Sequence, residues 1–355
     1  ISSRPPVCSP TAIIEITMGG KTFDFWSGAA IVSPPAIEAR LSITASWITR
    51  LPAVLAVISS PSRMLTHEAI SVPAAYRLYL PAAWASDAKR RAAAAVPAGV
   101  TFLTKWQIAL EQIDALRQEQ LPPAPVVADA GYGVVTAFRE GLTARGLPYV
   151  VGVREETTVW PPGIEPLPPR RWSGQGRPPT RLRRNARHHP VSVQTLARQL
   201  PPRSWRTLSW RQGTRGAMRS RFAYVRIRPA NGDERQARPH AIEGLLIEWP
   251  RDAAAPTKYW LSTLPPDTPL VQVVRLGKLR WRIERDYEEL KDQFGLDHYE
   301  GRGWRGFHHH GALCIATYAF LAAERARLSP PAPLSFLRPA RLPKGFTPRG
   351  AAGAT

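Results

Sequence analysis

The spacing of apolar positions becomes regular only after about residue 66. Residues 1–66 are rich in Ser, Ile, Ala and Pro, show no steady period, and support only short strands such as 21–26. Further along, 72–80 is typical of a strand and 82–95 of a helix. A longer amphipathic helix is predicted over 104–118, because its apolar residues recur at helical spacing. The residues expected to face the core are Trp106, Leu110, Ile113 and Leu116.

A strand–helix–strand pattern follows. Residues 125–128 form a short apolar run that ends at Asp129 and a glycine-containing turn, a helix is predicted over 135–144, and 149–153 is again apolar. Short loops between such elements favour a βαβ unit with two parallel strands. Functional residues gather at the carboxyl ends of such strands, which makes Asp129 a candidate. The alternative, given the same weight, is that this aspartate only caps the turn.

Residues 155–270 change character, because they are broken by proline, rich in Trp and lean toward strands. The strands predicted in this segment cover 222–228, 245–249 and 258–263. Between them and the βαβ unit, the stretch 170–189 holds seven Arg and no acid, which is typical of a phosphate-seeking loop or of a plain surface loop. Its candidate DNA-binding side chains are Arg170, Arg171, Arg183 and Arg184.

The chain then returns to helix over 269–294 and 312–327. The last residues, 329–355, are rich in Pro and Arg and contain no acid, so a disordered tail is predicted. The order of elements predicts an α/β fold.

The net charge of the chain restricts the kinds of molecule that it is expected to bind. The 355 residues carry a formal net charge of +21, with a pI near 11.0. Arginine dominates the basic residues and matches phosphate oxygens bidentately, which favours nucleic acid over a membrane surface. The alternative is a high-GC genome, which enriches Arg, Ala and Pro without any function.

The amino-acid composition excludes several classes of protein. Cys8 and Cys314 are the only cysteines in the sequence, so a disulfide framework and a cysteine zinc site are ruled out. The longest apolar run, 312–323, is too short to cross a bilayer, and no signal peptide opens the chain. We therefore expect a cytoplasmic protein, associated with the nucleoid.

One helical face concentrates charge. In the run 280–291, Arg280, Glu284 and Lys291 are spaced four and seven residues apart, which aligns them on one face of a helix. A carboxylate between two cations suits an enzyme that holds a metal ion while it grips phosphates. The alternative is a solvated charged face, because i,i+4 ion pairs are common on exposed helices.

Taken together, these motifs resemble the DDE-type insertion-sequence transposases. Asp129, in Val-Val-Ala-Asp-Ala-Gly-Tyr-Gly, is similar to the second acid of that superfamily. Arg280, Glu284 and Lys291 match its third-acid signature, Y-x2-R-x3-E-x6-K, although Gly277 stands at the Tyr position. The resemblance covers about residues 70–325.

The resemblance implies a ribonuclease-H-like catalytic domain interrupted by a β-rich insertion. It further implies two Mg²⁺ (or Mn²⁺) ions held by Asp129 and Glu284 as catalytic metal ligands, with Arg280 and Lys291 holding DNA phosphates. Trp281 or Trp260 would stack on a displaced base, although a core role is the more frequent one for a Trp. The implied partner is double-stranded DNA, both transposon ends and target, bound by a homodimer on paired ends.

The expected organisation has five parts. They are an aberrant or non-homologous segment at 1–66, the first part of the ribonuclease-H-like domain at 67–154, the basic insertion at 155–270, the last part of the domain at 271–328, and the tail at 329–355.

A first acid is not recognisable. Before Asp129 the only aspartates are Asp24, Asp87 and Asp114, and only Asp24 has a strand-like context. We therefore expect residues 1–66 to lack both the first acid and the first strands of the catalytic sheet. This would impair cutting and joining of DNA. Two alternatives remain: a non-catalytic DNA-binding relic or regulator, and a metal-dependent nuclease that uses Asp24 as a substitute.

Overall fold

The computed structural model describes residues 15–18, 21–24, 40–42, 54–57, 62–66, 71–118, 124–213, 216–233 and 236–328. The predicted disordered tail, 329–355, lies outside the described residues, as does most of 1–53. No helix among the described residues is long and apolar enough to span a membrane.

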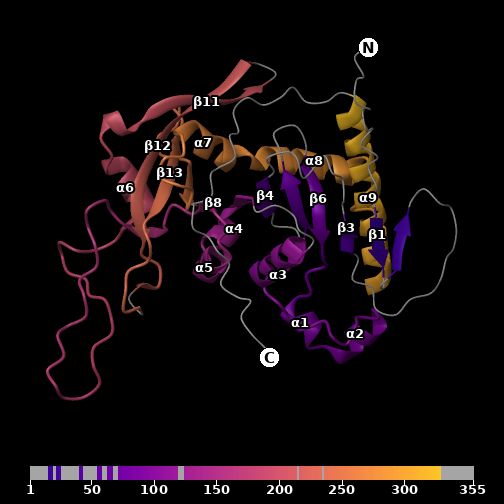
Figure 1. The fold of residues 1–355 in the computed structure, drawn as a ribbon, viewed down its shortest axis with the longest axis horizontal. Coiled ribbons are helices and arrows are strands. Elements are labelled where there is room, and N and C mark those ends of the chain that lie inside the picture. The colour runs from indigo at the N-terminus through magenta and orange to yellow at the C-terminus, as the bar shows by residue number, and fades with distance from the viewer. Residues whose placement is uncertain are drawn as a thin grey trace, which may run out of the picture.

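Among the described residues, a mixed sheet of eleven strands carries helices on its faces, which confirms the predicted α/β class (Figure 1). Its strands follow the order β10-β9-β12-β13-β14-β8-β7-β4-β5-β6, and β11 pairs with β12. The half of the sheet that ends at β6 contains β4 (Val54–Val57), β5 (Ser62–Thr66), β6 (Ser71–Tyr76), β7 (Val126–Ala128) and β8 (Tyr149–Val153). A separate small sheet contains β1 (Glu15–Met18), β2 (Lys21–Asp24) and β3 (Arg40–Ser42).

The predicted parallel pair is present, since β7 and β8 run parallel in the register Ala128↔Val151. On its other side β7 pairs in parallel with β4, and Val57 lies opposite Ala128. The antiparallel strands β5 and β6 then complete this end of the sheet. The expectation that residues 1–66 would lack the first strands is therefore wrong, because β4 and β5 supply them.

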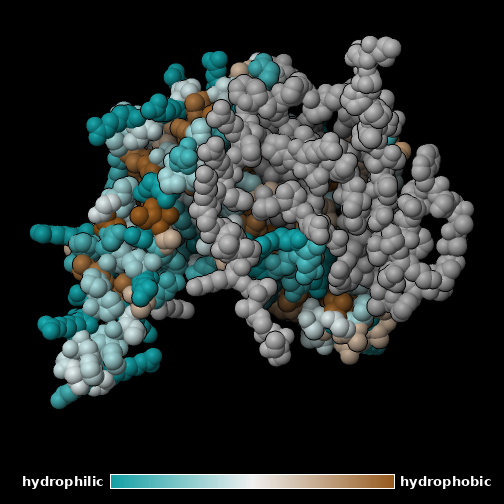
Figure 2. Space-filling model, in the orientation of Figure 1, coloured by the Kyte–Doolittle hydropathy of each residue, from teal (hydrophilic) through white to brown (hydrophobic). Residues whose placement is uncertain are grey.

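The segment predicted as a β-rich insertion extends this same sheet, because β14 pairs antiparallel with β8. Its strands are β9 (Thr158–Trp160), β10 (Val191–Ser192), β11 (Arg206–Gly213), β12 (Gly216–Pro229), β13 (Glu243–Trp249) and β14 (Lys258–Ser262). Two short helices, α6 (Val193–Gln199) and η1 (Pro202–Ser204), separate β10 from β11. The arginine-rich loop projects from this part of the molecule, and the visible face over it is largely hydrophilic (Figures 1 and 2).

The helices differ from the predictions mainly at their ends. The helix predicted over 82–95 is two short ones, α1 (Ala82–Ala85) and α2 (Ala88–Ala93), because Asp87 caps α2 by accepting a hydrogen bond from the Arg90 backbone N–H. The helix predicted over 269–294 is likewise two, α7 (Leu270–Lys278) and α8 (Arg280–Asp292). The remaining helices are α3 (Lys105–Gln118), α4 (Ala130–Gly133), α5 (Thr136–Ala144) and α9 (Trp304–Leu328).

Apolar side chains fill both faces of the sheet. On one face, α3 and α5 bury Ile113 and Phe138 against Val126. On the other face, α7 and α8 bury Val274 and Ile283 against the strands. This second layer carries the face of α8 on which the candidate acid lies.

Candidate active site

Asp129 lies directly after β7 and serves as the N-cap of α4. Its Oδ1 accepts hydrogen bonds from the backbone N–H groups of Gly131, at 2.9 Å, and Tyr132, at 3.3 Å. The capping role and the position at a strand end therefore both hold. The side chain of Asp129 is only 9% exposed, and its second oxygen, Oδ2, faces α8.

The glycines after Asp129 are required by close packing. A Cβ atom on Gly133 would lie 1.9 Å from the carbonyl oxygen of Gly152 on β8. A Cβ on Gly152 would in turn lie 3.1 Å from the backbone nitrogen of Ala130. The short helix α4 can rest on β8 only without these side chains, and this contact holds the Asp129 cap in place.

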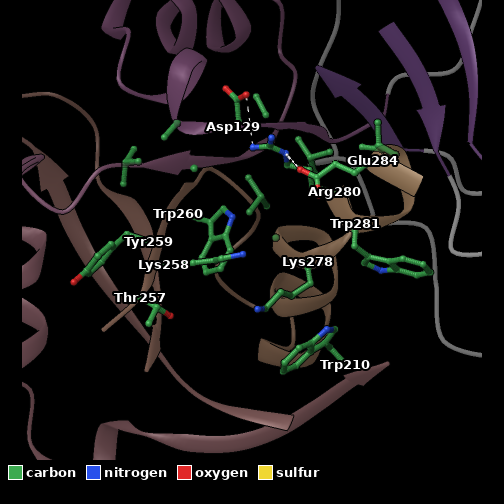
Figure 3. Close-up of a pocket in the computed structure, with 18 of the residues that line it drawn as sticks. Asp129, Trp210, Thr257, Lys258, Tyr259, Trp260, Lys278, Arg280, Trp281 and Glu284 are labelled. Carbon is green, nitrogen blue, oxygen red and sulfur yellow. Dashed lines mark ion pairs between the residues drawn. The ribbon is translucent and has the colours of Figure 1, made fainter. Parts of the chain in front are cut away.

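Arg280 bridges Asp129 and Glu284 (Figure 3). Its Nη1 lies 3.6 Å from Oδ2 of Asp129, and its Nε lies 2.9 Å from Oε1 of Glu284. The Nε–H is not aligned as a hydrogen bond, so the second contact is an ion pair by distance alone. The Glu284 side chain is 60% exposed, so solvent screens this pair strongly.

A buried carboxylate fixes the position of α8. Asp286 is 1% exposed and accepts hydrogen bonds from the Ser71 backbone N–H, at 2.9 Å, and from Arg282 Nε, at 2.7 Å. Burial raises the pKa of Asp286, and the contacts with Ser71 and Arg282 oppose that rise. Because Ser71 begins β6, this network ties the helix of Glu284 to the edge strand of the sheet.

A cleft of about 420 Å³ opens beside the two carboxylates. Asp129, Arg280 and Glu284 line one part of it, and its other part receives side chains from β14, α7, α8 and β11 (Figure 3). The polar and aromatic residues of that second part include Trp210, Arg211, Lys258, Trp260, Lys278 and Trp281.

Lys278 is a cleft residue that the sequence motifs do not single out. Its Nζ donates to Glu248 Oε1 at 2.6 Å and lies 4.3 Å from the ring centroid of Trp210. Burial lowers the pKa of Lys278, while the hydrogen bond to Glu248 opposes that shift. The signal in the sequence is Glu248 itself, a lone acid in the apolar strand Leu245-Leu246-Ile247-Glu248-Trp249.

Both Trp candidates line the cleft, and each is in contact with other side chains. Trp260 is 7% exposed and packs within the core cluster beneath α7, which agrees with the core alternative. A Cβ on Gly277 would lie 3.4 Å from Trp260, so the indole occupies space that a tyrosine at this signature position would need. The guanidinium of Arg211 covers the Trp281 ring, 3.7 Å from its centroid.

The other predicted cations lie away from the cleft. Lys291 does not line it, and its Nζ lies 4.9 Å from the Tyr287 ring centroid. In the basic loop, Arg183 Nε donates to the Pro168 carbonyl at 2.9 Å, and Arg184 pairs with buried Asp233. Arg170 and Arg171 are exposed, without a role in the cleft.

Residues 57–217 match the family model described as DDE superfamily endonuclease. Over this range the chain is similar to the DDE superfamily. The match contains Asp129 and ends before Arg280 and Glu284, so it supports the superfamily without testing the third-acid signature. It begins at Val57, so residues 57–66, the end of the segment expected to be non-homologous, lie within the matched range. No match was found among curated proteins.

The DDE superfamily consists of nucleases that usually use divalent metal ions and act on DNA. The side chains present here do not fit a two-ion site. Neither β4 nor β5 contains an Asp or Glu, and no group of three or more possible metal ligands occurs within the described residues. The guanidinium of Arg280 stands between the two carboxylates instead. Asp24 lies on β2, in the separate small sheet.

Proposed function

We propose that this DDE-type chain descends from an insertion-sequence transposase, binds double-stranded DNA, and is impaired in cutting and joining it. The observation that carries the proposal is the sequence of β4. This strand lies beside β7, with Val57 in register with the residue before Asp129. An acid on β4 would share the carboxyl edge with Asp129, and the strand reads Val-Leu-Ala-Val.

Asp129 and Glu284 are the proposed remnants of the metal-binding set, and Arg280 and Lys291 are the proposed phosphate contacts. In the superfamily, divalent ions activate the attacking oxygen and stabilise the leaving one. Hard cations such as Mg²⁺ take several oxygen ligands, and Asp129 already commits Oδ1 to the cap of α4. Loss of one of three carboxylates is therefore expected to weaken metal binding and to abolish DNA strand transfer.

A non-catalytic DNA-binding relic or regulator is the second candidate. Its support is the basic surface of the insertion, where Arg206 and Arg219 are exposed on the β11–β12 hairpin, and Arg170 and Arg171 on the loop. Such side chains provide sequence-independent attraction to the DNA backbone. Both candidates bind DNA, and they differ in whether a restored acid brings back cleavage.

The test is DNA cleavage in Mg²⁺ or Mn²⁺ by the full chain and by Ala56→Asp. Ala56 is the register partner of Val127, which lines the cleft two residues before Asp129. Ala56→Asn is the matched control, because it adds a side chain of the same shape without the charge. We expect no nicking of supercoiled plasmid by the full chain or the control, and detectable nicking by Ala56→Asp that Glu284→Gln removes.

The cleavage and DNA-binding results distinguish the two candidate functions. Nicking by the unmodified chain that disappears in Glu284→Ala would contradict impairment. Duplex DNA binding without cleavage by Ala56→Asp would favour the relic. Absence of DNA binding, measured by anisotropy with a labelled duplex at low salt, would overturn both candidates.

A further inference from the structure

A second hollow, of about 340 Å³, lies outside the acid cleft and is lined by aromatic rings. We call it the aromatic pocket, and its rings belong to Tyr79, Trp84, Tyr299, Trp304 and Phe307. Tyr79 follows β6, Trp84 lies on α1, and Trp304 and Phe307 belong to the first turn of α9. The residues at the mouth are partly open to solvent, with Trp84 39% exposed.

The wall formed by residues 299–307 is built around one ring. Tyr299 donates a hydrogen bond from its hydroxyl to the Gly303 carbonyl at 3.0 Å. A Cβ atom on Gly301 or Gly306 would lie 2.4 Å or 2.3 Å from the Tyr299 ring or hydroxyl. The glycines of this run therefore make room for the ring, and the wall is shaped before any ligand arrives.

The facing wall is held by hydrogen bonds to backbone carbonyls. The backbone N–H of Trp304 donates to the Ala94 carbonyl at 2.8 Å, which joins the start of α9 to the end of α2. Arg91 donates to the carbonyls of Val100, at 2.7 Å, and Pro97, at 2.9 Å, and so closes the loop behind α2. The pocket therefore lies where the start of α9 is hydrogen-bonded to the end of α2.

The electrostatics of the aromatic pocket favour an anionic ligand with a flat apolar part. Arg302 lines the hollow, and no Asp or Glu does. Lys105 Nζ lies 5.4 Å from the Tyr79 ring centroid, and the Arg90 guanidinium lies 5.6 Å from that of Trp84. Aromatic faces with nearby cations are the features that bind unpaired bases and their phosphates in single-stranded nucleic acid.

Size and position restrict the ligand further. A hollow of 340 Å³ is at the small end for ligand sites, too small for a base pair with its backbones and adequate for one nucleotide. The strand before it, β6, runs in the same direction as β4 and β7, because β5 is antiparallel to both β4 and β6. The residues that follow β6 and line the pocket therefore lie at the carboxyl edge of the sheet, the edge on which Asp129 lies.

We propose that the aromatic pocket binds one unpaired nucleotide of a DNA strand, stacking its base against Trp84 and Tyr79 and placing its phosphate near Arg302. The proposal deepens the proposed function, since it assumes that DNA is the ligand of this chain. It assigns the segment 299–307 and the helices α1 and α2 a recognition role separate from the acid cleft.

The test compares the affinity of the full chain for two labelled single strands of DNA. One is a twelve-nucleotide oligo-dT, the other is its abasic analogue with the same backbone, and binding is measured by fluorescence anisotropy. We expect oligo-dT to bind about tenfold more tightly than the abasic strand, in the range of one base–aromatic stack. Trp84→Ala should remove that difference, and Trp84→Phe should keep most of it. Trp172→Ala is the matched control, because Trp172 is also exposed, at 51%, and lies in the basic loop.

Equal affinity for oligo-dT and the abasic strand would overturn the proposal that the aromatic pocket binds a base. The same proposal would be overturned if Trp84→Ala left the difference in affinity unchanged. A difference lost equally in Trp172→Ala would place base stacking elsewhere and overturn it as well. Binding of a labelled duplex is measured as well, because it distinguishes failure of the pocket proposal from failure of the proposed function. Duplex binding that persists without base discrimination defeats the pocket alone, whereas loss of all DNA binding defeats the proposed function.

Discussion

The Arg280 guanidinium lies 3.6 Å from the carboxylate of Asp129 and keeps its Nε 2.9 Å from Glu284 on the next turn of α8. One cation therefore neutralises the two acids that would otherwise attract a metal ion. The relationship follows from the junction between α7 and α8, which places Arg280 in the first turn of α8, opposite the cap of α4.

Arg280→Gln should increase the affinity of the isolated chain for Mn²⁺. Removing the guanidinium leaves Asp129 and Glu284 without their shared partner, and each partly exposed ion pair contributes at most about 1 kcal/mol, or about fivefold in affinity. Electron paramagnetic resonance of free Mn²⁺ measures the change without DNA or catalysis.

Two further variants complete the Arg280 experiment. Lys291→Gln removes one positive charge from the same helix, where Nζ lies over Tyr287, and is expected to leave Mn²⁺ affinity unchanged. Arg280→Gln combined with Glu284→Gln should return the affinity to its original level. A gain that survives in this double variant would mean that the ion binds elsewhere.

Asp286→Ala should destabilise the protein by about 3 kcal/mol, because it leaves Arg282 and the Ser71 N–H without their buried acceptor. Urea unfolding followed by Trp fluorescence measures the change. Glu288→Ala, an exposed position on the same helix, is expected to stay within about 0.5 kcal/mol. Similar losses in the two variants would show that the Asp286 network does not anchor α8.

The elements predicted correctly from the sequence are those with a strong local pattern. The strand 149–153 and the helix 104–118 agree with β8 and α3 almost residue for residue, and Leu110, Ile113 and Leu116 are buried as expected. Asp129 was found because a short apolar strand followed by a glycine turn is itself a local signal.

The features that were missed depend on contacts between distant residues. The strand β4 pairs with β7 and the strand β5 pairs with β6, and the first of these pairings joins residues about 70 positions apart, which no local pattern determines. The break at Leu279 has no Pro or Gly at the junction itself. The ion pairs of Arg280 and the burial of Lys278 depend on how α7 and α8 cross the sheet, which periodicity does not determine.

His308 should make stability depend on pH in the acidic range. It is 4% exposed, its Nδ1 hydrogen-bonds the Trp304 carbonyl at 2.9 Å, and its Nε2 accepts from the Leu78 N–H. Burial lowers the pKa of His308 below its usual 6.5. Below that pH the unfolded chain binds more protons than the native one, so the contribution of the neutral ring is present above 6.5 and falls as pH decreases.

The His308 effect is measured by urea unfolding at pH 7.0, 6.0 and 5.0. The unmodified chain should lose up to about 1.4 kcal/mol per pH unit through this group, and His308→Gln should lose correspondingly less. His309→Gln is the control, because the neighbouring ring is exposed and should keep the full slope. Identical slopes in the two variants would assign the pH dependence to other groups.

Gly133→Ala tests the packing that positions Asp129. The added Cβ would lie 1.9 Å from the Gly152 carbonyl, so α4 must move away from β8, with an expected loss of about 3 kcal/mol in the free energy of unfolding. Gly99→Ala is the matched control, since nothing lies within 4 Å of its Cβ and a neutral or slightly stabilising effect is expected. Thermal unfolding of the two variants gives the comparison. A Gly133→Ala protein as stable as the control would show that α4 tolerates displacement and that its contact with β8 does not hold the Asp129 cap.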